Sequence, residues 1–561
     1  MRLPGVAARI PLRAAFLGGL FAALVTLPGL GVGTLWDNSE TAYGEVAREI
    51  LITHDWLVMH LNGVAWFVQP PLYFWMAAFF AKLFGVGPFA LRLPSALATI
   101  ATGAAVGYAT ARIAGTRCGI YAAVIVSTSL MQAIVGRLAI MDALLDLAVA
   151  AAILWWFRAF EPPRSARALD AAKRAGAFVG GAASIGFGFL AKGPVALAMV
   201  VLVVGVWLAW ERRVRSPLLT PRGTTILAAT AVMLAICVPW FVLLANKMGA
   251  GAVAELIGHY TIGRYTGVIE NQRGPWWYYL PVLVIGFFPW IAFVPVGFVR
   301  ACRAAHAPEG AFARLAIVWA LIPLVFFSCA QTKLPNYIAL EFPALAIIVA
   351  LWFERISAGR DRRAALASAA VVPLTVGFLT LATSIFGKDN HLTAAMTAVA
   401  PQLFTLVAGM LAGSIATVVV IALPRVRPAA PYVLAATSLA LVNFIALVAE
   451  PAAEPLKPIP RMAAIIDRER KPGDTVAIRD VSGGNALTFY TEPGVKTIDA
   501  GDERSFRAAI CAPGSTYIVT RRDDVAVLED VARRLGRTFT RLDANGRAAL
   551  VRVAAGACRR G

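Results

Sequence analysis

The sequence predicts an α-helical polytopic membrane protein with about 13 transmembrane helices and a small C-terminal α/β extracytoplasmic domain. Its composition predicts the membrane part, because 59% of the 561 residues are hydrophobic, 15% are charged and the mean hydropathy is +0.70. A soluble protein of this length carries about a quarter charged residues. The chain after about residue 455 is polar, which predicts the separate domain.

Thirteen apolar runs are long enough to cross a bilayer as helices. The stretch 71–90 is also apolar, but it contains Lys82 and ends in Gly-Val-Gly-Pro. We therefore expect it to lie on the outer face as an interfacial or re-entrant helix. The expected domains are a transmembrane domain over 1–450, with an outer loop at 35–91, and a soluble domain over 455–561. The expected spans are 14–34, 92–113, 118–135, 143–160, 176–191, 194–210, 224–245, 277–299, 313–330, 337–353, 366–386, 402–423 and 431–449.

Basic residues cluster in short loops between the apolar runs and explain the net charge of +20. Loops of this kind face the cytoplasm and its anionic lipid, so the charge does not indicate a nucleic-acid partner. The first run is expected to be an uncleaved span, because no small-residue cleavage site follows it. The expected spans place all the basic loops on the side of the N-terminus: 158–176, 211–223, 300–314, 353–365 and 424–431.

The polar tail combines short strands with a helix. The segments TVAIRDVSG, GVKTID and STYIVTRR have the pattern of strands, and DDVAVLEDVARRLG has four apolar residues on one helical face. Cys511 and Cys558 lie in this tail and could pair only if it is extracytoplasmic.

Ionisable and aromatic residues converge on the outer side from six separate stretches of sequence. Ionisable groups near membrane depth are costly, so they usually serve a pathway or a site. The residues are Asp37, Glu40, Tyr43, Arg48, Asp55, Arg137, Asp142, Lys192, His259, Arg264, Lys333 and Tyr337.

Three of these residues are cations in outer corners: Lys192 in LAKGPVA, Arg264 in HYTIGRYTG and Lys333 in QTKLPNY. Each lysine could be a snorkelling side chain at a tight turn. Together the three favour a ligand that carries a phosphate or pyrophosphate.

The acids and aromatics leave alternatives open. Asp142 and Glu40 each begin an expected helix, so either could be an N-terminal acid favoured by the helix dipole. The aromatic segment 274–290 could be an interfacial belt or could line a groove for an isoprenoid chain. The five histidines and six cysteines show no metal-binding spacing, so no specific metal site is predicted.

The sequence resembles GT-C glycosyltransferases of the protein-mannosyltransferase type, and among them the aminoarabinose transferases that modify lipid A. Seven blocks in order carry the resemblance: WDNSETAYGEVAREI, HDWLVMHLNG, FVQPPLYFW, RLAIMDALLDL, LAKGPVAL, RGPWWYYLPVLVIGFFPW and KLPNYIALEFPALA. The resemblance implies an enzyme that moves a sugar, with inversion, from a polyprenyl-phosphate-linked donor to a lipid, glycan or protein acceptor. It places the reaction on the periplasmic face of a bacterial inner membrane, and no Gly-rich phosphate loop suggests a nucleotide-sugar donor.

Some positions depart from the family pattern. In the first outer loop Glu40 and Tyr43 match, whereas Ser39 and Ala42 replace an acid and an arginine, and Asp37 could supply the missing carboxylate.

In the next block a Glu-Lys pair of the aminoarabinose enzymes is replaced by Val68-Gln69. A lysine contact to substrate is therefore absent, and a divalent metal is left open. These departures favour a related transferase with another sugar or acceptor.

The expected reaction is a direct displacement at the anomeric carbon, with cations stabilising the departing phosphate and a carboxylate taking a proton from a hydroxyl acceptor. Alternatives are a flippase or transporter of lipid-linked sugars, although no internal repeat is found, and a catalytically degenerate lipid-binding relative. The expected site comprises catalytic Asp37, Glu40 and Asp142, phosphate-binding Lys192, Arg264, Lys333 and Tyr337, and substrate-binding Tyr43, Gln69 and His259.

Overall fold

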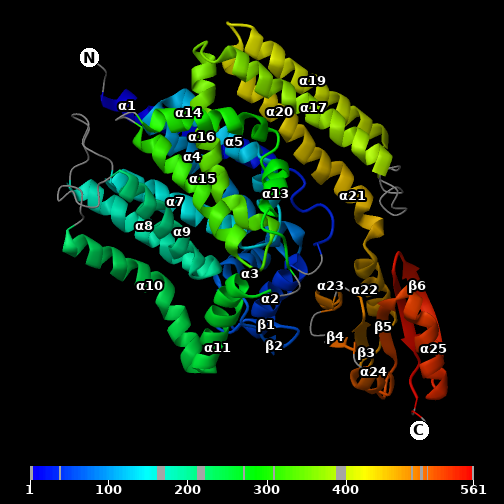
Figure 1. The fold of residues 1–561 in the computed structure, drawn as a ribbon. Coiled ribbons are helices and arrows are strands. Elements are labelled where there is room, and N and C mark those ends of the chain that lie inside the picture. Colours follow the sequence, from blue (N-terminus) through cyan, green and yellow to red (C-terminus); the bar gives the residue numbers. More distant parts are fainter. Residues whose placement is uncertain are drawn as a thin grey trace.

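A computed structural model of the chain contains a bundle of long helices and a C-terminal sheet (Figure 1). This confirms the predicted fold class. The structure describes residues 4–36, 39–160, 171–211, 222–268, 272–306, 310–386, 400–481, 484–492, 497–501, 503–556 and 558.

The apolar runs form helices because a membrane-embedded backbone must satisfy its own hydrogen bonds. Each of the 13 expected spans overlaps one or more of these helices. By length and composition, eight of the described helices could each cross a membrane, or nine if one bent pair is a single span. The number 13 therefore stays a prediction. The bundle contains α1 (Pro4–Thr26), α4 (Pro88–Ala114), α5 (Thr116–Thr128), α6 (Leu130–Val135), α7 (Asp142–Phe160), α8 (Ala171–Lys192), α9 (Val195–Trp210), α10 (Gly223–Met248), α13 (Tyr279–Gly286), α14 (Val294–Ala305), α15 (Ala311–Cys329), α16 (Phe342–Ser357), α17 (Arg362–Phe386), α19 (Ala400–Ala422) and α20 (Ala430–Phe444).

Two expected spans are wrong as straight helices. The range 277–299 contains α13 and a second helical segment, η2 (Trp290–Phe293) with α14, which meet at a bend of 104°. Pro289 lies at the break and has no N–H to continue a helical ladder. The range 118–135 is divided between α5 and α6 at Ser129, whose backbone is extended.

The stretch 71–90 contains α3 (Leu72–Phe84), which ends at Gly85 with φ +85°. Thirteen helical residues span about 20 Å, which is shorter than the roughly 30 Å of a bilayer core. Phe79 and Phe84 on this helix are exposed. These features agree with the interfacial position that the sequence predicts.

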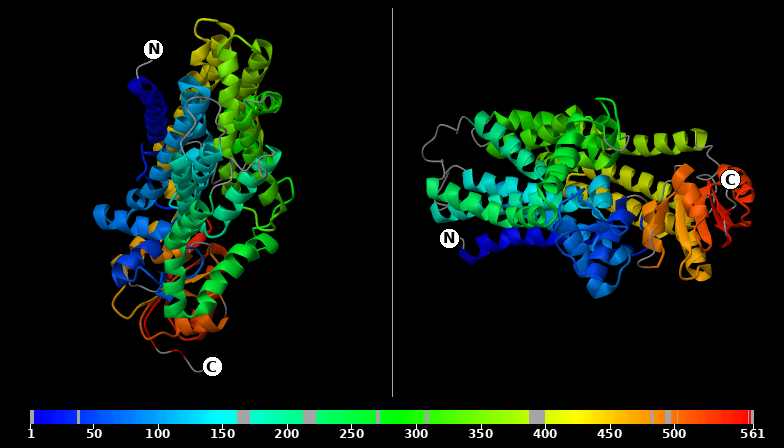
Figure 2. Two further views of the ribbon diagram at one scale, coloured as in Figure 1. Left: turned by 90° about the vertical axis from the view of Figure 1, so that its left-hand side faces the viewer. Right: turned by 90° about the horizontal axis from the view of Figure 1, so that it is seen from below.

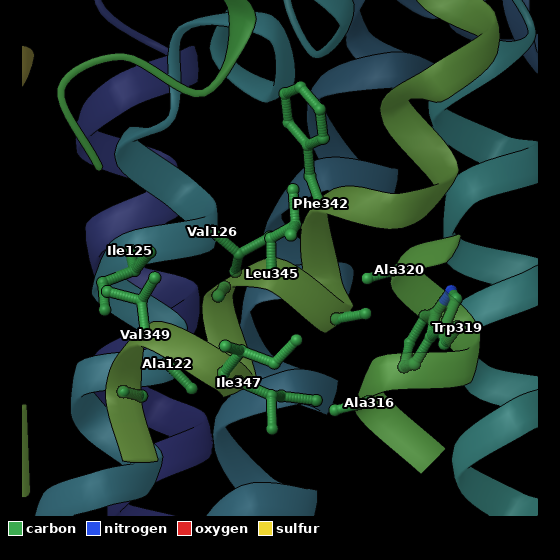
Figure 3. Packing of buried hydrophobic residues seen from close by; sticks show 14 of the residues in the cluster. Ala122, Ile125, Val126, Ala316, Trp319, Ala320, Phe342, Leu345, Ile347 and Val349 are labelled. Atoms are coloured by element: carbon green, nitrogen blue, oxygen red, sulfur yellow. The ribbon is translucent and has the colours of Figure 1, made fainter. Parts of the chain in front are cut away.

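The centre of the bundle is a dry core of apolar side chains (Figure 3). Residues of α5, α15 and α16 interdigitate there, with Ile125, Trp319 and Leu345 from the three helices in turn. The Trp319 indole N–H donates to the Leu340 carbonyl at 2.8 Å. This close-packed core holds the ends of the helices, where the polar residues lie, in fixed positions.

The outer loop and the C-terminal domain lie at the same end of the molecule (Figures 1 and 2). The loop contains α2 (Ser39–Thr53), a short hairpin of β1 (His60–Leu61) and β2 (Val64–Ala65), and α3. Shorter elements complete the transmembrane part: α11 (Ala250–Ala254), η1 (Glu255–Ile262), α12 (Gly263–Thr266), η3 (Pro335–Glu341), η4 (Arg427–Ala429), η5 (Ile445–Ala449), α21 (Glu450–Ala453) and η6 (Glu454–Leu456).

The C-terminal domain is a five-stranded mixed sheet in the order β4-β3-β5-β7-β6. The parallel strands β3, β4 and β5 and the helix α25 are the elements that the sequence predicts, and the antiparallel β6–β7 hairpin is an addition. The elements are α22 (Pro458–Glu469), β3 (Thr475–Arg479), α23 (Gly484–Tyr490), β4 (Thr497–Asp499), α24 (Glu503–Ile510), β5 (Thr516–Arg521), η7 (Arg522–Asp524), α25 (Val525–Arg534), β6 (Phe539–Asn545) and β7 (Ala548–Val553).

A disulfide joins Cys511 to Cys558 across 47 positions of sequence. It ties the residue after α24 to the segment after β7. The pairing that the sequence allows for an extracytoplasmic tail is therefore present.

Candidate active site

Lys192 and Asp142 form a largely buried ion pair at the ends of two helices. Asp142 is the first residue of α7 and Lys192 the last of α8, and their side chains are 6% and 15% exposed. The corner after Lys192 is sharp because Gly193 adopts φ +74° and donates its N–H to Phe189 at 2.7 Å, as helix C-caps commonly do. The sequence thus places a cation and an anion face to face.

Tyr337 completes this cluster from a third segment. The Lys192 ammonium lies 4.9 Å from the centre of the Tyr337 ring, a cation–π distance. Tyr337 lies in η3 and packs on Phe327 of α15 at 5.1 Å. Lys192 therefore contacts both Asp142 and Tyr337, two other residues that the sequence analysis assigned to the site.

Asp146 was missed by the sequence analysis. It lies one helical turn after Asp142 on α7, is 3% exposed, and its Oδ2 has no hydrogen-bond partner among the described residues. The signal was present in the sequence as a second acid inside an apolar helix. Its position beneath the ion pair makes it a candidate for the same site.

Lys333 has a different environment from Lys192. Its ammonium donates to the carbonyls of Phe327, Ser328 and Ala330 at 3.2, 2.7 and 2.8 Å. All three N–H donors are thus used at the C-terminus of α15, a favourable place for a cation. Burial lowers the pKa of Lys333 below its usual value. The structure gives Lys333 a capping role and leaves it no donor for a phosphate.

Arg264 lies beside the segment that carries Lys333. The Arg264 carbonyl accepts the Thr332 N–H at 3.1 Å, and the Tyr265 carbonyl accepts the Gln331 N–H at 3.0 Å. The two predicted cations on α12 and after α15 therefore come from neighbouring pieces of backbone.

An apolar groove of about 600 Å³ lies between α10, α11 and η1. Its end at Gly258 precedes the exposed His259, and Thr261 on the same π-helix lies near Gly193, where an added Cβ would be 3.5 Å from the Thr261 hydroxyl. The helix that lines one side of the groove therefore also contacts the corner that carries Lys192. Its lining includes Phe241, Val242, Ala245, Val253, Ile257 and Gly258.

Glu40 is buried and fully engaged. One oxygen accepts the Arg92 Nε–H at 3.0 Å and the Ala139 N–H at 2.5 Å. The other accepts Arg92 Nη2–H at 3.0 Å and the Trp36 N–H at 2.8 Å. Four donors fill the acceptor capacity of a carboxylate, so the geometry favours a positioning role for Glu40 over the predicted catalytic one.

Arg92 is the second residue that the sequence analysis missed. It begins the expected span 92–113, and its guanidinium also donates to Leu30, Val32 and Thr34 carbonyls and lies 3.4 Å from Glu450. A lone arginine at the start of an apolar run was the available signal. Glu40 and Arg92 together join the first outer loop, α4, the segment before α7 and α21.

This network brings the first outer loop next to the ion pair. The Ala139 N–H donates to Glu40, and Ala139 is three residues from Asp142. At most about 10 Å of chain therefore separates the hydrogen bond to Glu40 from the Lys192–Asp142 ion pair. The Ser95 hydroxyl also donates to Ile140 at 2.7 Å and fixes the same segment to α4.

The remaining predicted residues are placed as follows. Tyr43 on α2 packs among aromatic rings, with Phe74 at 5.5 Å and Trp66 at 6.1 Å between centroids. Gln69 is buried just before α3. Asp37 lies outside the described residues. In the described part of the chain no three His, Cys, Asp or Glu side chains are grouped to hold a metal ion.

Glu45 is buried on α2 and pairs with Arg48 at 2.6 Å. Burial raises the pKa of Glu45 to about 7, against the opposing effect of Arg48. Its carboxyl is therefore protonated in the folded protein at pH values where it is ionised in the unfolded chain.

Stability is expected to fall as the pH rises from about 4.5 to 7, because the folded state binds the proton more tightly. Relative to Glu45→Gln, the wild type should lose about 3 kcal/mol over this interval. Thermal unfolding of the two proteins in detergent across the interval checks this. The exposed Glu529→Gln variant is the control and should retain the wild-type slope, whereas equal slopes for wild type and Glu45→Gln would contradict the assignment.

Known proteins resemble this chain in sequence and in fold. A family model described as dolichyl-phosphate-mannose-protein mannosyltransferase matches residues 68–244. The undecaprenyl phosphate-alpha-4-amino-4-deoxy-L-arabinose arabinosyl transferase of Edwardsiella ictaluri is 33% identical over 337 residues, 60% of this chain and 58% of the relative. The enzyme of the same name from Erwinia tasmaniensis is 32% identical over 345 residues, 60% and 59% of the two chains.

The crystal structure of ArnT from Cupriavidus metallidurans bound to undecaprenyl phosphate matches with a TM-score of 0.80. The match covers 96% of this chain and 97% of that chain at 22% identity. This chain has the fold of that ArnT structure. The GT-C resemblance stated from the sequence blocks is thus confirmed. This chain spans slightly less than three fifths of the length of the curated relatives it matches.

Proposed function

We propose that this GT-C protein transfers a sugar from a polyprenyl-phosphate-linked donor to a lipid acceptor at the periplasmic face of a bacterial inner membrane. The observation that carries the proposal is that the helix η1 lines the apolar groove and also contacts the corner beside the Lys192–Asp142 pair. A groove and a buried cation linked by one helix suit a molecule with an isoprenoid chain and a phosphate. The relatives' names favour an aminoarabinose-type pentose as the first sugar to test, and lipid A as the first acceptor.

The proposed reaction is a single displacement. The acceptor oxygen forms a bond to the anomeric carbon, and the bond from that carbon to the phosphate oxygen breaks. Lys192 stabilises the negative charge that collects on the departing polyprenyl phosphate, with Arg264 as a second candidate cation. A hydroxyl acceptor passes its proton to Asp142 or Asp37, whereas an ionised phosphate acceptor needs no base. Tyr43, Gln69 and His259 are proposed to contact the substrates.

The disulfide supports the proposed orientation. Structural disulfides persist in oxidising compartments such as the periplasm, and Cys511–Cys558 lies in the domain at the same end as the first outer loop.

The test is transfer by the purified protein. Undecaprenyl-phosphate aminoarabinose and lipid A are supplied, and mass spectrometry should find a pentose-sized increment on lipid A with one undecaprenyl phosphate released per sugar. A hexose donor is run in parallel. An intact donor in both reactions would reject the transferase, and movement of labelled donor across a vesicle bilayer would then identify a flippase.

The orientation of the C-terminal domain is tested separately, in cells that express the protein. Cys558→Ser frees the exposed Cys511, which should react with a membrane-impermeant maleimide in intact spheroplasts. The Cys511→Ser/Cys558→Ser double variant is the control for the other four cysteines. Labelling only after lysis would place the domain in the cytoplasm.

A further inference from the structure

The C-terminal domain is fastened to the first outer loop by Arg48 of α2. The guanidinium donates to the carbonyls of Phe489 and Thr491 at 2.9 and 3.1 Å through one nitrogen, and to Thr488 at 2.9 Å through another. These are the carbonyls at the C-terminus of α23, which have no partner within the helix. Arg48 is 6% exposed, so this cap is made in a desolvated interface.

Other contacts join the same two surfaces. The Tyr490 hydroxyl accepts the Leu35 N–H at 2.6 Å. The Asn62 side chain both donates to and accepts from the Thr497 backbone, at 2.7 and 3.1 Å. Gly44 lies so close to Phe489 that an added Cβ would be 3.0 Å from its ring. The interface is therefore specific in geometry and continues from residue 35 to residue 62.

The docked surface belongs to the loop that carries candidate site residues. Arg48 follows Tyr43 and Glu40 on the same short helix, by five and eight residues. Leu35 directly precedes Trp36, whose N–H bonds Glu40. A change in the fit of the C-terminal domain is therefore transmitted to α2 and to its candidate site residues Glu40 and Tyr43.

We propose that the C-terminal domain is a positioning element of the active site, with Arg48 as the residue that holds the first outer loop in place. The inference rests on the proposed transferase function and deepens it. In this proposal the domain holds the site residues in position, whereas the alternative role is to bind the acceptor alone. Because small displacements of catalytic geometry cost about a hundredfold in rate, loosening this contact should act on kcat.

The experiment compares three full-length variants in the aminoarabinose transfer assay. Arg48→Met removes the donors and keeps the side-chain length, and Arg48→Lys keeps a cation able to reach helix carbonyls, as Lys333 does. Arg461→Met is the control, because Arg461 is exposed and pairs with Asp543 within the domain. Amide hydrogen exchange of residues 39–50 is measured on each protein.

The expected result is that Arg48→Met lowers kcat about a hundredfold at unchanged KM for donor and acceptor, and speeds exchange in residues 39–50 but not in α7–α9. Arg48→Lys should recover most of the rate, and Arg461→Met should behave as wild type. A raised acceptor KM at normal kcat would overturn positioning in favour of acceptor docking. Faster exchange with normal kinetics would also overturn it. If no variant, including wild type, transfers sugar, the transferase proposal fails, while the exchange data still decide whether Arg48 holds the loop.

Discussion

Lys192→Ala is expected to reduce sugar transfer by a factor of about 10² to 10³, the range for removing one preorganised charge-stabilising group. Lys192 is the cation that the structure holds beside Asp142 and over the Tyr337 ring. Without it, the departing phosphate loses its counter-charge and Asp142 becomes an unpaired buried acid.

The matched control is Lys82→Ala, on the exposed side of α3. Transfer is measured as sugar increment on lipid A, and folding as monodisperse elution of the detergent-solubilised protein. Lys192→Ala should elute as wild type. Lys192→Arg should recover part of the rate, because the charge is kept but the guanidinium is wider. Full transfer by Lys192→Ala would exclude a role for this lysine at the phosphate.

Lys333→Ala separates the two lysines that looked alike in sequence. Lys333 caps α15 with all three donors. Its removal should therefore lower the unfolding temperature and leave the transfer rate of the folded protein nearly unchanged. A lower transfer rate at an unchanged unfolding temperature would instead support a contact between Lys333 and the phosphate.

Arg92→Met is expected to destabilise the protein by about 3 to 5 kcal/mol, the cost of breaking a buried ion pair. Glu40 is 1% exposed and would be left without its cationic partner. Three backbone carbonyls of the segment between α1 and α2 would lose donors at the same time. Thermal unfolding of purified protein measures the loss.

The double variant Glu40→Gln/Arg92→Met should recover part of this stability, because the buried carboxylate of Glu40 is then removed together with its partner. The control is Arg117→Met, whose partner Glu354 is partly exposed and whose loss should cost at most about 1 kcal/mol. Equal effects of Arg92→Met and Arg117→Met would show that the buried pair does not hold the outer loop.

Hydropathy predicted the membrane helices and the C-terminal domain, because lipid and water impose different compositions on the chain. It did not predict the bend between α13 and α14, since a proline in an apolar run is compatible with a straight or a broken helix. The contacts of Asp142, Lys192 and Tyr337 follow from their common position at helix ends on one side, which the pattern of spans supplies.

The roles of Glu40, Lys333 and Arg48 could not be predicted in the same way. Glu40 meets Arg92 from 52 residues away, and only the folded packing shows that its oxygens are occupied. Lys333 and Arg48 bind main-chain carbonyls, and a carbonyl carries no side-chain identity that a sequence pattern could detect. Tertiary partners therefore decided which polar residues remain available for chemistry.

The network around Arg92 joins parts of the chain that are made at very different times. Glu40 and Arg92 emerge early from the ribosome, whereas Glu450 follows Arg92 by 358 residues. At about 5 to 20 residues per second, translation takes roughly 20 to 70 s to supply that last partner. Throughout this interval the nascent outer loop also lacks the C-terminal domain, whose helix α23 is capped by Arg48 of the loop. The first outer loop, although made early, is thus among the last parts of the chain to reach its final packing.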